Sequence, residues 1–252
     1  MARELLSLLL VILLFGTTIG MNNNTDTIAS CRTTDVVVRL PPFLCTREAR
    51  GSSYKPLPTG WLYGNWKLTY SSQASYQSLE NLELDSSPVF PQSAALLGQA
   101  NDLSSYTLPN STILQTGYGV DTPRRSRDKT LGPEWDDVYD FVGNGVLAIT
   151  DTSFAFLAWG YDTIGVPYVV IYESPVTLTG IPSAIDIESR SQGGPSKATL
   201  DKIFQELRAL NNPEITQLVY QIKPLVRNGN RANTGPVVCD AACVNNTVQA
   251  SP

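Results

Sequence analysis

The chain of 252 residues carries a net charge of −5, with 42% hydrophobic and 16% charged residues. The acidic balance argues against a nucleic acid or an anionic membrane as partner. The complete absence of histidine excludes a Ser-His-Asp or Cys-His catalytic site and any metal site built on imidazole. What remains is a folded chain, long enough for one large β domain or two small ones.

Residues 1–20 have the order of a secretory signal peptide. Arg3 supplies the charged start, residues 5–15 the apolar core, and residues 18–20 a small-residue exit. The apolar run is too short to cross a bilayer, so we expect cleavage, with an uncleaved anchor as the alternative. The segment predicts entry into the secretory pathway and a secreted product without a stable membrane anchor.

The cysteines and the glycosylation sequons fit this route. The four cysteines are Cys31, Cys45, Cys239 and Cys243. An even number in a secreted chain predicts two disulfides, with three possible connectivities. No Cys-x-x-Cys occurs and the compartment is oxidising, so we expect no metal site. Asn-x-Ser/Thr sequons at Asn23, Asn110 and Asn245 predict a glycoprotein.

The first elements after an N-terminal arm, residues 21–58, are predicted strands of a domain at residues 59–223. Within Gly64–Tyr70, Trp66, Leu68 and Tyr70 share one face, and polar residues occupy the other. Residues 81–85 and 112–118 are further strands. We interpret residues 86–108 as a long loop that could include one helical turn and act as a lid.

Charged residues cluster in the next segment. Residues 121–128 hold three arginines, which favours a solvated loop, or alternatively a clamp for an anionic group or a processing site. A strand with surface aspartates is predicted at residues 135–141. Residues 145–150 then lead into a strand at residues 154–159, which turns into a strand at residues 168–172, so that two successive hairpins are predicted. Antiparallel strands with short turns build an up-and-down barrel more readily than a parallel sheet.

The last part of the domain predicts one strand, one helix and a short strand. Residues 185–190 alternate and end in Arg190. Residues 196–210 form the one clear helix, with Ser196 as N-cap and apolar residues at helical spacing. Residues 218–222 are predicted as a final short strand, followed by a tail at residues 224–252 held by its cysteines.

Gly64-Asn65-Trp66, a late strand ending in Arg190 and one following helix, in that order, resemble the lipocalins over residues 60–222. The resemblance implies a mainly β chain, an up-and-down antiparallel barrel with one C-terminal helix packed outside. Trp66 would plug the closed end with Arg190 across its ring, both structural residues. The Thr-Asp-Tyr-like turn of that family is absent, because Pro167 precedes Tyr168, which points to an outlying branch.

The resemblance also bears on the disulfides. It favours bridges from the N-terminal arm to the C-terminal tail. The alternative pairs Cys31 with Cys45 and Cys239 with Cys243.

An eight-stranded barrel leaves room for one small ligand, so aromatic residues on its inner face become a binding surface. The expected ligand-binding residues are Tyr118, Phe154, Phe156, Trp159, Tyr168 and Tyr172. Asp186 and Glu188 could act as acid/base groups only if their strand turns them inward. Their alternation with Ile185 and Ile187 predicts instead that they face solvent.

Two functions follow from the resemblance. The first is a cofactor-free cyclase or isomerase, pericyclase-type and Diels–Alderase-like, because secreted lipocalin-like proteins are similar to cyclases of fungal secondary-metabolite biosynthesis. The alternative is a non-catalytic secreted carrier. Either would be a monomer that binds a small hydrophobic molecule without a cofactor. No catalytic residue is assigned by the sequence.

Overall fold

The structure is a computed structural model that describes residues 40–41, 44, 57–58, 60–90, 98–124 and 137–246. The predicted signal peptide and most of the predicted arm lie outside the described residues. So do Asn23, Cys31, Cys45 and Asp136.

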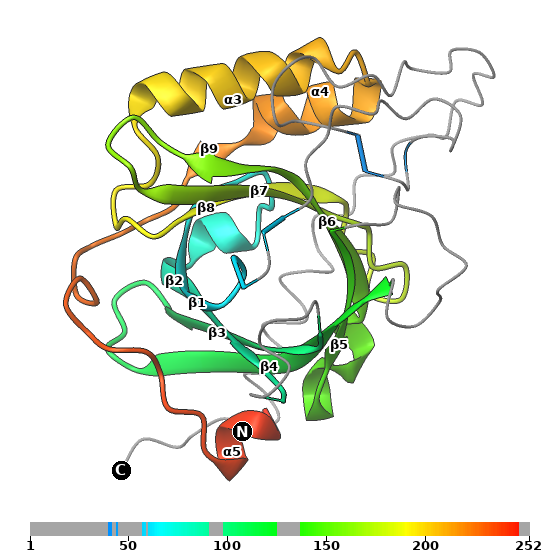
Figure 1. Ribbon diagram of the computed structural model, residues 1–252. Coiled ribbons are helices and arrows are strands. Elements are labelled where there is room, and N and C mark those ends of the chain that lie inside the picture. Colours follow the sequence, from blue (N-terminus) through cyan, green and yellow to red (C-terminus); the bar gives the residue numbers. More distant parts are fainter. Residues whose placement is uncertain are drawn as a thin grey trace.

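Eight antiparallel strands form a closed barrel (Figure 1). They are β1 (Gly64–Ser71), β2 (Glu80–Pro88), β3 (Ala100–Thr107), β4 (Leu114–Pro123), β5 (Val138–Gly143), β6 (Thr152–Tyr161), β7 (Pro167–Glu173) and β8 (Ala184–Ser189). Each strand pairs with the next one along the chain, and β1 pairs with both β2 and β8. The predicted up-and-down barrel is therefore confirmed.

A ninth strand completes the wall where β1 and β2 separate. β1 and β2 pair only from Gly64 to Lys67 on β1. Beyond that point β9 (Lys223–Pro224) pairs with the last residues of β1, and Val226 bridges to Glu80 at the start of β2. The C-terminal segment thus fills the seam between the first two strands.

One strand lies where the sequence predicts a loop. Residues 100–107 form β3 and pair along their whole length with β4, so the interpretation of residues 86–108 as one long loop is wrong. The sequence of β3 is mostly polar because its inward-facing residues, Asp102 and Ser104 among them, belong to a polar side of the barrel interior (see below). Alternation with an apolar face is absent for that reason.

The helical elements are η3 (Tyr76–Ser78), η6 (Gly145–Thr150), α3 (Lys197–Ala209), α4 (Pro213–Gln221) and α5 (Ala241–Val244). α3 is the predicted helix, and the side chain of Ser196 accepts a hydrogen bond from the backbone N–H of Thr199. The strand predicted at residues 218–222 is wrong, because these residues belong mostly to α4. Asn212 caps α4 and Pro213 occupies its first turn, where a missing N–H costs nothing.

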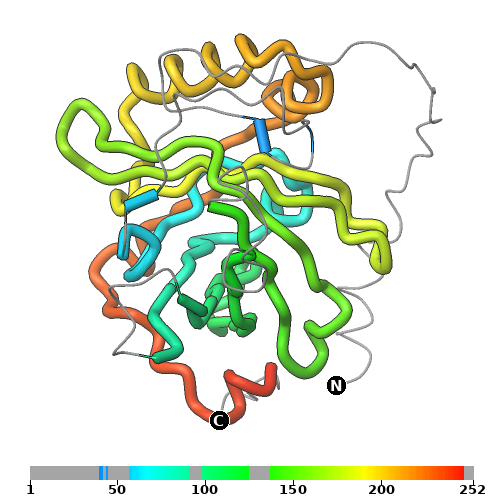
Figure 2. The backbone as a smooth tube through the Cα atoms, turned by 45° about the vertical axis from the view of Figure 1, so that its right-hand side comes forward, coloured from blue at the N-terminus to red at the C-terminus, as the bar shows by residue number. Residues whose placement is uncertain are grey.

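α3 and α4 lie together across the outer face of β7 and β8 (Figures 1 and 2). Ile185 and Ile187 point out of the barrel and pack against apolar residues of both helices, among them Leu207 and Ile215. All six residues of β8 are buried. The strand has protein on both sides, so its alternating sequence does not mark a solvent face.

Trp66 closes one end of the barrel. Its side chain is 1% exposed and belongs to the inner cluster with Phe156 and Val169. The guanidinium carbon of Arg190 lies 4.0 Å from the centroid of the Trp66 ring, the contact that the resemblance implied. We call this end of the barrel the closed end, and the opposite one, where β1 ends at Ser71, the open end.

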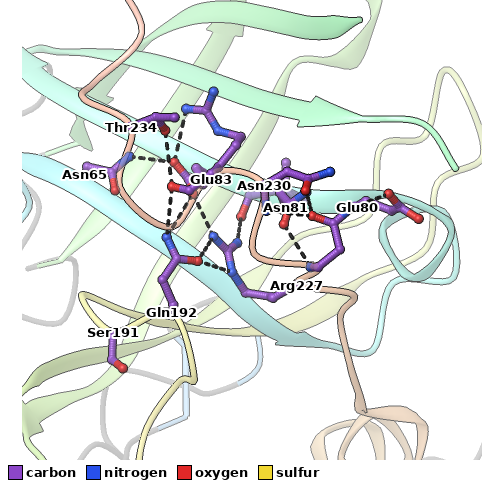
Figure 3. A network of polar contacts seen from close by, with 12 residues as sticks. Asn65, Glu80, Asn81, Glu83, Ser191, Gln192, Arg227, Asn230 and Thr234 are labelled. Carbon is purple, nitrogen blue, oxygen red and sulfur yellow. Dashed lines mark hydrogen bonds and ion pairs between the residues drawn. The ribbon is translucent and has the colours of Figure 1, made fainter. Parts of the chain in front are cut away.

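The tail crosses the outside of β1 and β2 through a buried polar network (Figure 3). Glu83 accepts hydrogen bonds from Arg227 at 2.6 Å and from Arg231 at 3.2 Å, and its side chain is 3% exposed. Burial alone would raise the pKa of Glu83, but the hydrogen bond from Arg227 and the charge of Arg231 leave it below its usual value. Charge, not a covalent bridge, fixes this segment to the barrel.

Cys239 and Cys243 form a disulfide with each other. The favoured pairing between arm and tail is therefore wrong for these two cysteines, and the alternative pairing is right for them. Separated by four positions, they close only a small loop around the start of α5. Asn246, just after α5, donates hydrogen bonds to the carbonyls of Tyr118 and Asn144 and accepts one from the Tyr118 N–H.

Candidate functional site: a carboxyl-lined barrel interior

The strand register determines which side chains face the interior. Directly paired residues share a face, and Trp66 on β1 pairs with Leu84, which pairs with Ser104. Extended around the sheet, this relationship places Asp102 of β3 and Asp121 of β4 on the inner face.

On the other side of β1, the pairing continues into β8 and β7. Leu68 pairs with Glu188, and Ser71 with Asp186. Asp186 in turn pairs with Ile171 of β7, which puts Glu173, two residues further on, on the same inner face.

The expectation that Asp186 and Glu188 face solvent is therefore wrong. Both side chains point inward, and the residues are 1% and 3% exposed. The two acids do alternate with Ile185 and Ile187, but the helices bury these isoleucines on the outside of the wall. Alternation identifies two faces, and only the packing of α3 and α4 decides which one looks inward.

Five carboxyl groups consequently share the interior: Asp102, Asp121, Glu173, Asp186 and Glu188. No salt bridge among the described residues includes any of them. At the closed end, the charge of Arg190 opposes the rise in the pKa of Glu188. Burying a carboxylate without a cation is costly, so protonation is the way such groups reduce the cost.

Burial raises the pKa of every one of these groups. It brings the pKa of Asp102 to about 7. The pKa of Asp186 also reaches about 7, through burial and the charge of Glu188, against a hydrogen bond from Ser71 that lowers it. Burial and the charges of Asp102 and Glu173 raise the pKa of Glu188 to about 8. At neutral pH the interior thus contains both protonated and ionised carboxyl groups.

The remaining two groups show the same trend. Burial raises the pKa of Asp121, and the charges of Asp102, Glu188 and Glu173 raise it further. Burial also raises the pKa of Glu173, together with the charge of Asp186 and a hydrogen bond between these two side chains. Two carboxyl groups can share a hydrogen bond only if one carries a proton.

The carboxyl groups form two opposed walls. Asp102 and Asp121 lie on β3 and β4, whereas the other three lie on β7 and β8. In the closed strand order these pairs of strands are separated by β5 and β6 on one side and by β1 and β2 on the other. We call the first pair the β3–β4 wall and the second set the β7–β8 wall.

Apolar side chains separate the two walls. On the β5–β6 side the ring planes of Tyr139 and Phe154 are stacked with centroids 5.4 Å apart, and Phe156 meets both edge-on. On the β1–β2 side the cluster of Leu68, Leu82 and Leu225 fills the wall. The interior is therefore polar along one axis and apolar along the other.

Several inner side chains remain accessible. On β3 the outward-facing Leu103 and Ser105 are 5% and 0% exposed, whereas the inward-facing Asp102 and Ser104 are only half-buried. Polar atoms without a hydrogen-bond partner include Oδ1 of Asp121 and of Asp186 and Oγ of Ser86, which pairs with Asp102. Buried polar atoms are rarely left unpaired, so these positions are suited to solvent or a polar guest.

Two short helices narrow the open end. Tyr76 of η3, in the β1–β2 connection, lies close enough to the carboxyl groups that the charge of Glu173 is the largest cause raising its pKa, followed by burial. On the facing side, η6 follows β5 and covers Gly143. A Cβ at Gly143 would lie 2.4 Å from the carbonyl oxygen of Leu147, so only glycine allows this close approach.

The six aromatic residues expected to bind a ligand do not lie together. Phe154, Phe156 and Trp159 belong to the inner cluster. Tyr168 and Tyr172 pack on the outer face beneath the helices, where the Tyr172 hydroxyl donates to Glu214 at 2.7 Å. Tyr118 pairs with Leu103 on the outer face, and its hydroxyl donates to Asn101.

The structure also places the predicted arginine cluster and two of the predicted glycosylation sites. Arg124 forms an ion pair with Asp140 at 3.0 Å on the outer face of the barrel. Asn110 lies exposed in a turn, and Asn245 is exposed at the end of α5.

Outside the barrel, a cleft of about 500 Å³ lies between the β6–β7 end and α3. Trp159, Tyr161, Tyr168 and Lys202 are among its lining residues. This cleft contains none of the five interior carboxyl groups. Among the described residues, no cluster of metal-ligating side chains suits an ion, and no helix could span a membrane.

Fold and interior together define an up-and-down antiparallel β-barrel with five carboxyl groups on its inner face. No family model matches the chain. Among solved structures, insecticyanin from the tobacco hornworm Manduca sexta is 11% identical with a TM-score of 0.49, over 71% of this chain and 86% of that chain. H1 crustacyanin from the lobster Homarus americanus is 13% identical with a TM-score of 0.44, over 66% of this chain and 77% of that chain.

A curated relative is much closer in sequence. The botcinic acid biosynthesis cluster B protein 12 of Botryotinia fuckeliana is 30% identical over 215 residues, which cover 84% of this chain and 92% of that protein. The chain belongs to the family of this biosynthesis-cluster protein.

Proposed function

We propose that the protein is a cofactor-independent cyclase or isomerase of secondary-metabolite biosynthesis that acts on a small molecule inside the barrel. The observation that carries the proposal is the set of five interior carboxyl groups, none of which forms a salt bridge within the described part of the chain. An apolar lining is enough for a carrier of a hydrophobic molecule. Acid and base groups held near neutral pKa are what proton transfer requires.

The chemistry would be general acid–base catalysis in an enclosed site. A protonated carboxyl group donates to a substrate oxygen where negative charge develops, and an ionised one accepts a proton from another position of the same molecule. Asp186 and Glu188 are the proposed catalytic residues. The aromatic side chains of Phe154 and Phe156 would hold the carbon skeleton in a reactive conformation. No atoms are gained or lost, so the product is an isomer of the substrate.

The membership in a biosynthesis-cluster family supports a role on a metabolite of such a pathway. The gene would be deleted in the organism that encodes it, and extracts compared by mass spectrometry. We expect a compound to accumulate that purified protein converts to an isomer of equal mass. Asp186→Asn and Glu188→Gln should each slow the conversion roughly a hundredfold, whereas the exposed-site control Asp201→Asn should not.

The second candidate, a secreted carrier, rests on the barrel itself. A carrier would retain the accumulated compound unchanged in stoichiometric amount, and Asp186→Asn would alter at most its affinity. Retention without any isomer, in protein shown to be folded, would overturn the proposal of an enzyme.

A further inference from the structure

The two carboxyl walls define the class of ligand, an inference that rests on the proposed function for its site. We infer that the barrel selects an uncharged molecule with a rigid apolar body and oxygen acceptors on two opposite edges. One acceptor would meet Asp102 of the β3–β4 wall and the other Asp186 of the β7–β8 wall. The stacked rings of Tyr139 and Phe154 and the leucines of β1 and β2 would contact the body between them.

The first step of the argument concerns free hydrogen-bonding capacity. Ser86 is 9% exposed, pairs with Asp102 on the inner face, and its Oγ has no partner. On the opposite wall, Oδ1 of Asp186 also has none. A ligand that hydrogen-bonds only one wall would leave the other unsatisfied, which costs affinity because buried polar groups without partners are unfavourable.

The second step concerns charge. Asp102, Asp121, Glu173, Asp186 and Glu188 face the interior, and Tyr76 and Tyr139 are phenols near them. The buried Asp137 also acts on Tyr139 by its charge. Arg190 lies at the closed end over Trp66, and its charge acts on Glu188. An anionic ligand would meet the carboxyl groups and is excluded. A neutral acceptor accepts hydrogen bonds from the protonated carboxyl groups, so its binding requires no change in protonation.

The test uses probes that share one carbon skeleton. Decalin-2,6-dione has carbonyl groups on opposite edges, 2-decalone has one, 2-aminodecalin is a cation, and decalin-2-carboxylate is an anion. Binding to the full-length protein would be measured at pH 6 by calorimetry and by tryptophan fluorescence. We expect the dione to bind roughly fivefold more tightly than the ketone, the value of one further hydrogen bond, and the carboxylate to bind least.

Variants separate this inference from the proposed reaction. Asp102→Asn keeps a hydrogen-bond donor, so it should preserve the preference for the dione. The double variant Asp102→Leu/Ser86→Ala removes both hydrogen-bond donors of the β3–β4 wall and should reduce dione binding to the level of the ketone, with folding checked by circular dichroism. Equal binding of dione and ketone, or tightest binding of the amine, would overturn the ligand class. Loss of isomer formation in Asp102→Asn would concern only the reaction.

Discussion

The guanidinium group of Arg190 lies over the ring of Trp66, with 4.0 Å between its carbon and the ring centroid, and donates hydrogen bonds to the carbonyls of Asn65 and Trp61 at 3.1 and 3.3 Å. A third bond goes to the carbonyl of Tyr63. One side chain therefore fixes the chain entering β1 and the aromatic floor of the barrel at once.

We expect Arg190→Ala to lower the free energy of unfolding by about 3 kcal/mol, because it removes the cation–π contact and leaves backbone carbonyls unpaired. Urea denaturation would measure the change. Arg190→Lys keeps the charge without the planar guanidinium group, so its free energy of unfolding should lie between those of the wild type and Arg190→Ala. Ligand affinity should be nearly unchanged at temperatures where the variant is folded, and a selective loss of affinity would contradict a structural role.

The network around Glu83 predicts a second effect on stability. Glu83→Gln leaves Arg227 and Arg231 buried without their carboxylate, which should cost about 3 kcal/mol. The matched control is Asp201→Asn, which removes an exposed ion pair with Lys197 and should change stability by less than about 0.5 kcal/mol. Similar values for the two variants would show that the network does not hold the tail.

The interior carboxyl groups predict that stability falls as pH rises. The pKa values of Asp186 and Glu188, about 7 and about 8 in the folded protein, exceed those of the unfolded chain. The folded state therefore binds more protons between about pH 4 and pH 8, and each group lowers stability by up to about 1.4 kcal/mol per pH unit in this range.

This pH dependence can be measured as the melting temperature against pH. The contribution of these groups is fully present below about pH 4 and is lost by about pH 8. Glu83 acts in the opposite direction, because its lowered pKa means that stability is lost as pH falls below its usual value. The double variant Asp186→Asn/Glu188→Gln should flatten the decline above pH 5, and an unchanged slope would refute buried, protonated carboxyl groups.

Peptide mapping should show the local disulfide of the tail. Trypsin cuts after Arg231, and no lysine or arginine follows. Cys239 and Cys243 should therefore appear in one unreduced peptide, lighter than its reduced form by the mass of two hydrogen atoms, after removal of any glycan. A peptide from the N-terminal region attached to this fragment would contradict the pairing.

Local patterns carried much of the fold. The cap and stripe of α3 depend on near neighbours in the chain, and the contact of Trp66 with Arg190 is implied by the family resemblance. The alternation in β1 holds for Trp66 and Leu68 only, because a bulge turns Tyr70 to the outer face. α4 had a comparable signal, Asn212 followed by Pro213 with Ile215, Leu218 and Val219 at helical spacing. The β-branched residues at its end suggested a strand instead, and packing against α3 decided the outcome.

The candidate site was harder to predict because it depends on long-range packing. Asp186 and Glu188 are candidate acid/base groups only if they face inward. Nothing in residues 185–190 predicts that helices cover the isoleucines and so turn the two acids inward. Asp102 and Asp121 gave no signal at all. Their strand partners are neighbours along the chain, but the carboxyl groups that they meet across the barrel, Glu173 and Glu188, come from distant parts of the chain.

The seam sealed by β9 has a consequence for biogenesis. Tyr70 of β1 pairs with Pro224 of β9. This edge of β1 can therefore be covered only after residues 223–224 have been synthesised. During synthesis the nascent chain passes through a stage with an uncapped strand edge beside an acidic lumen. Non-local closure of this kind is slow and exposes the intermediate to misassociation, which makes the final segment a determinant of yield as well as of architecture.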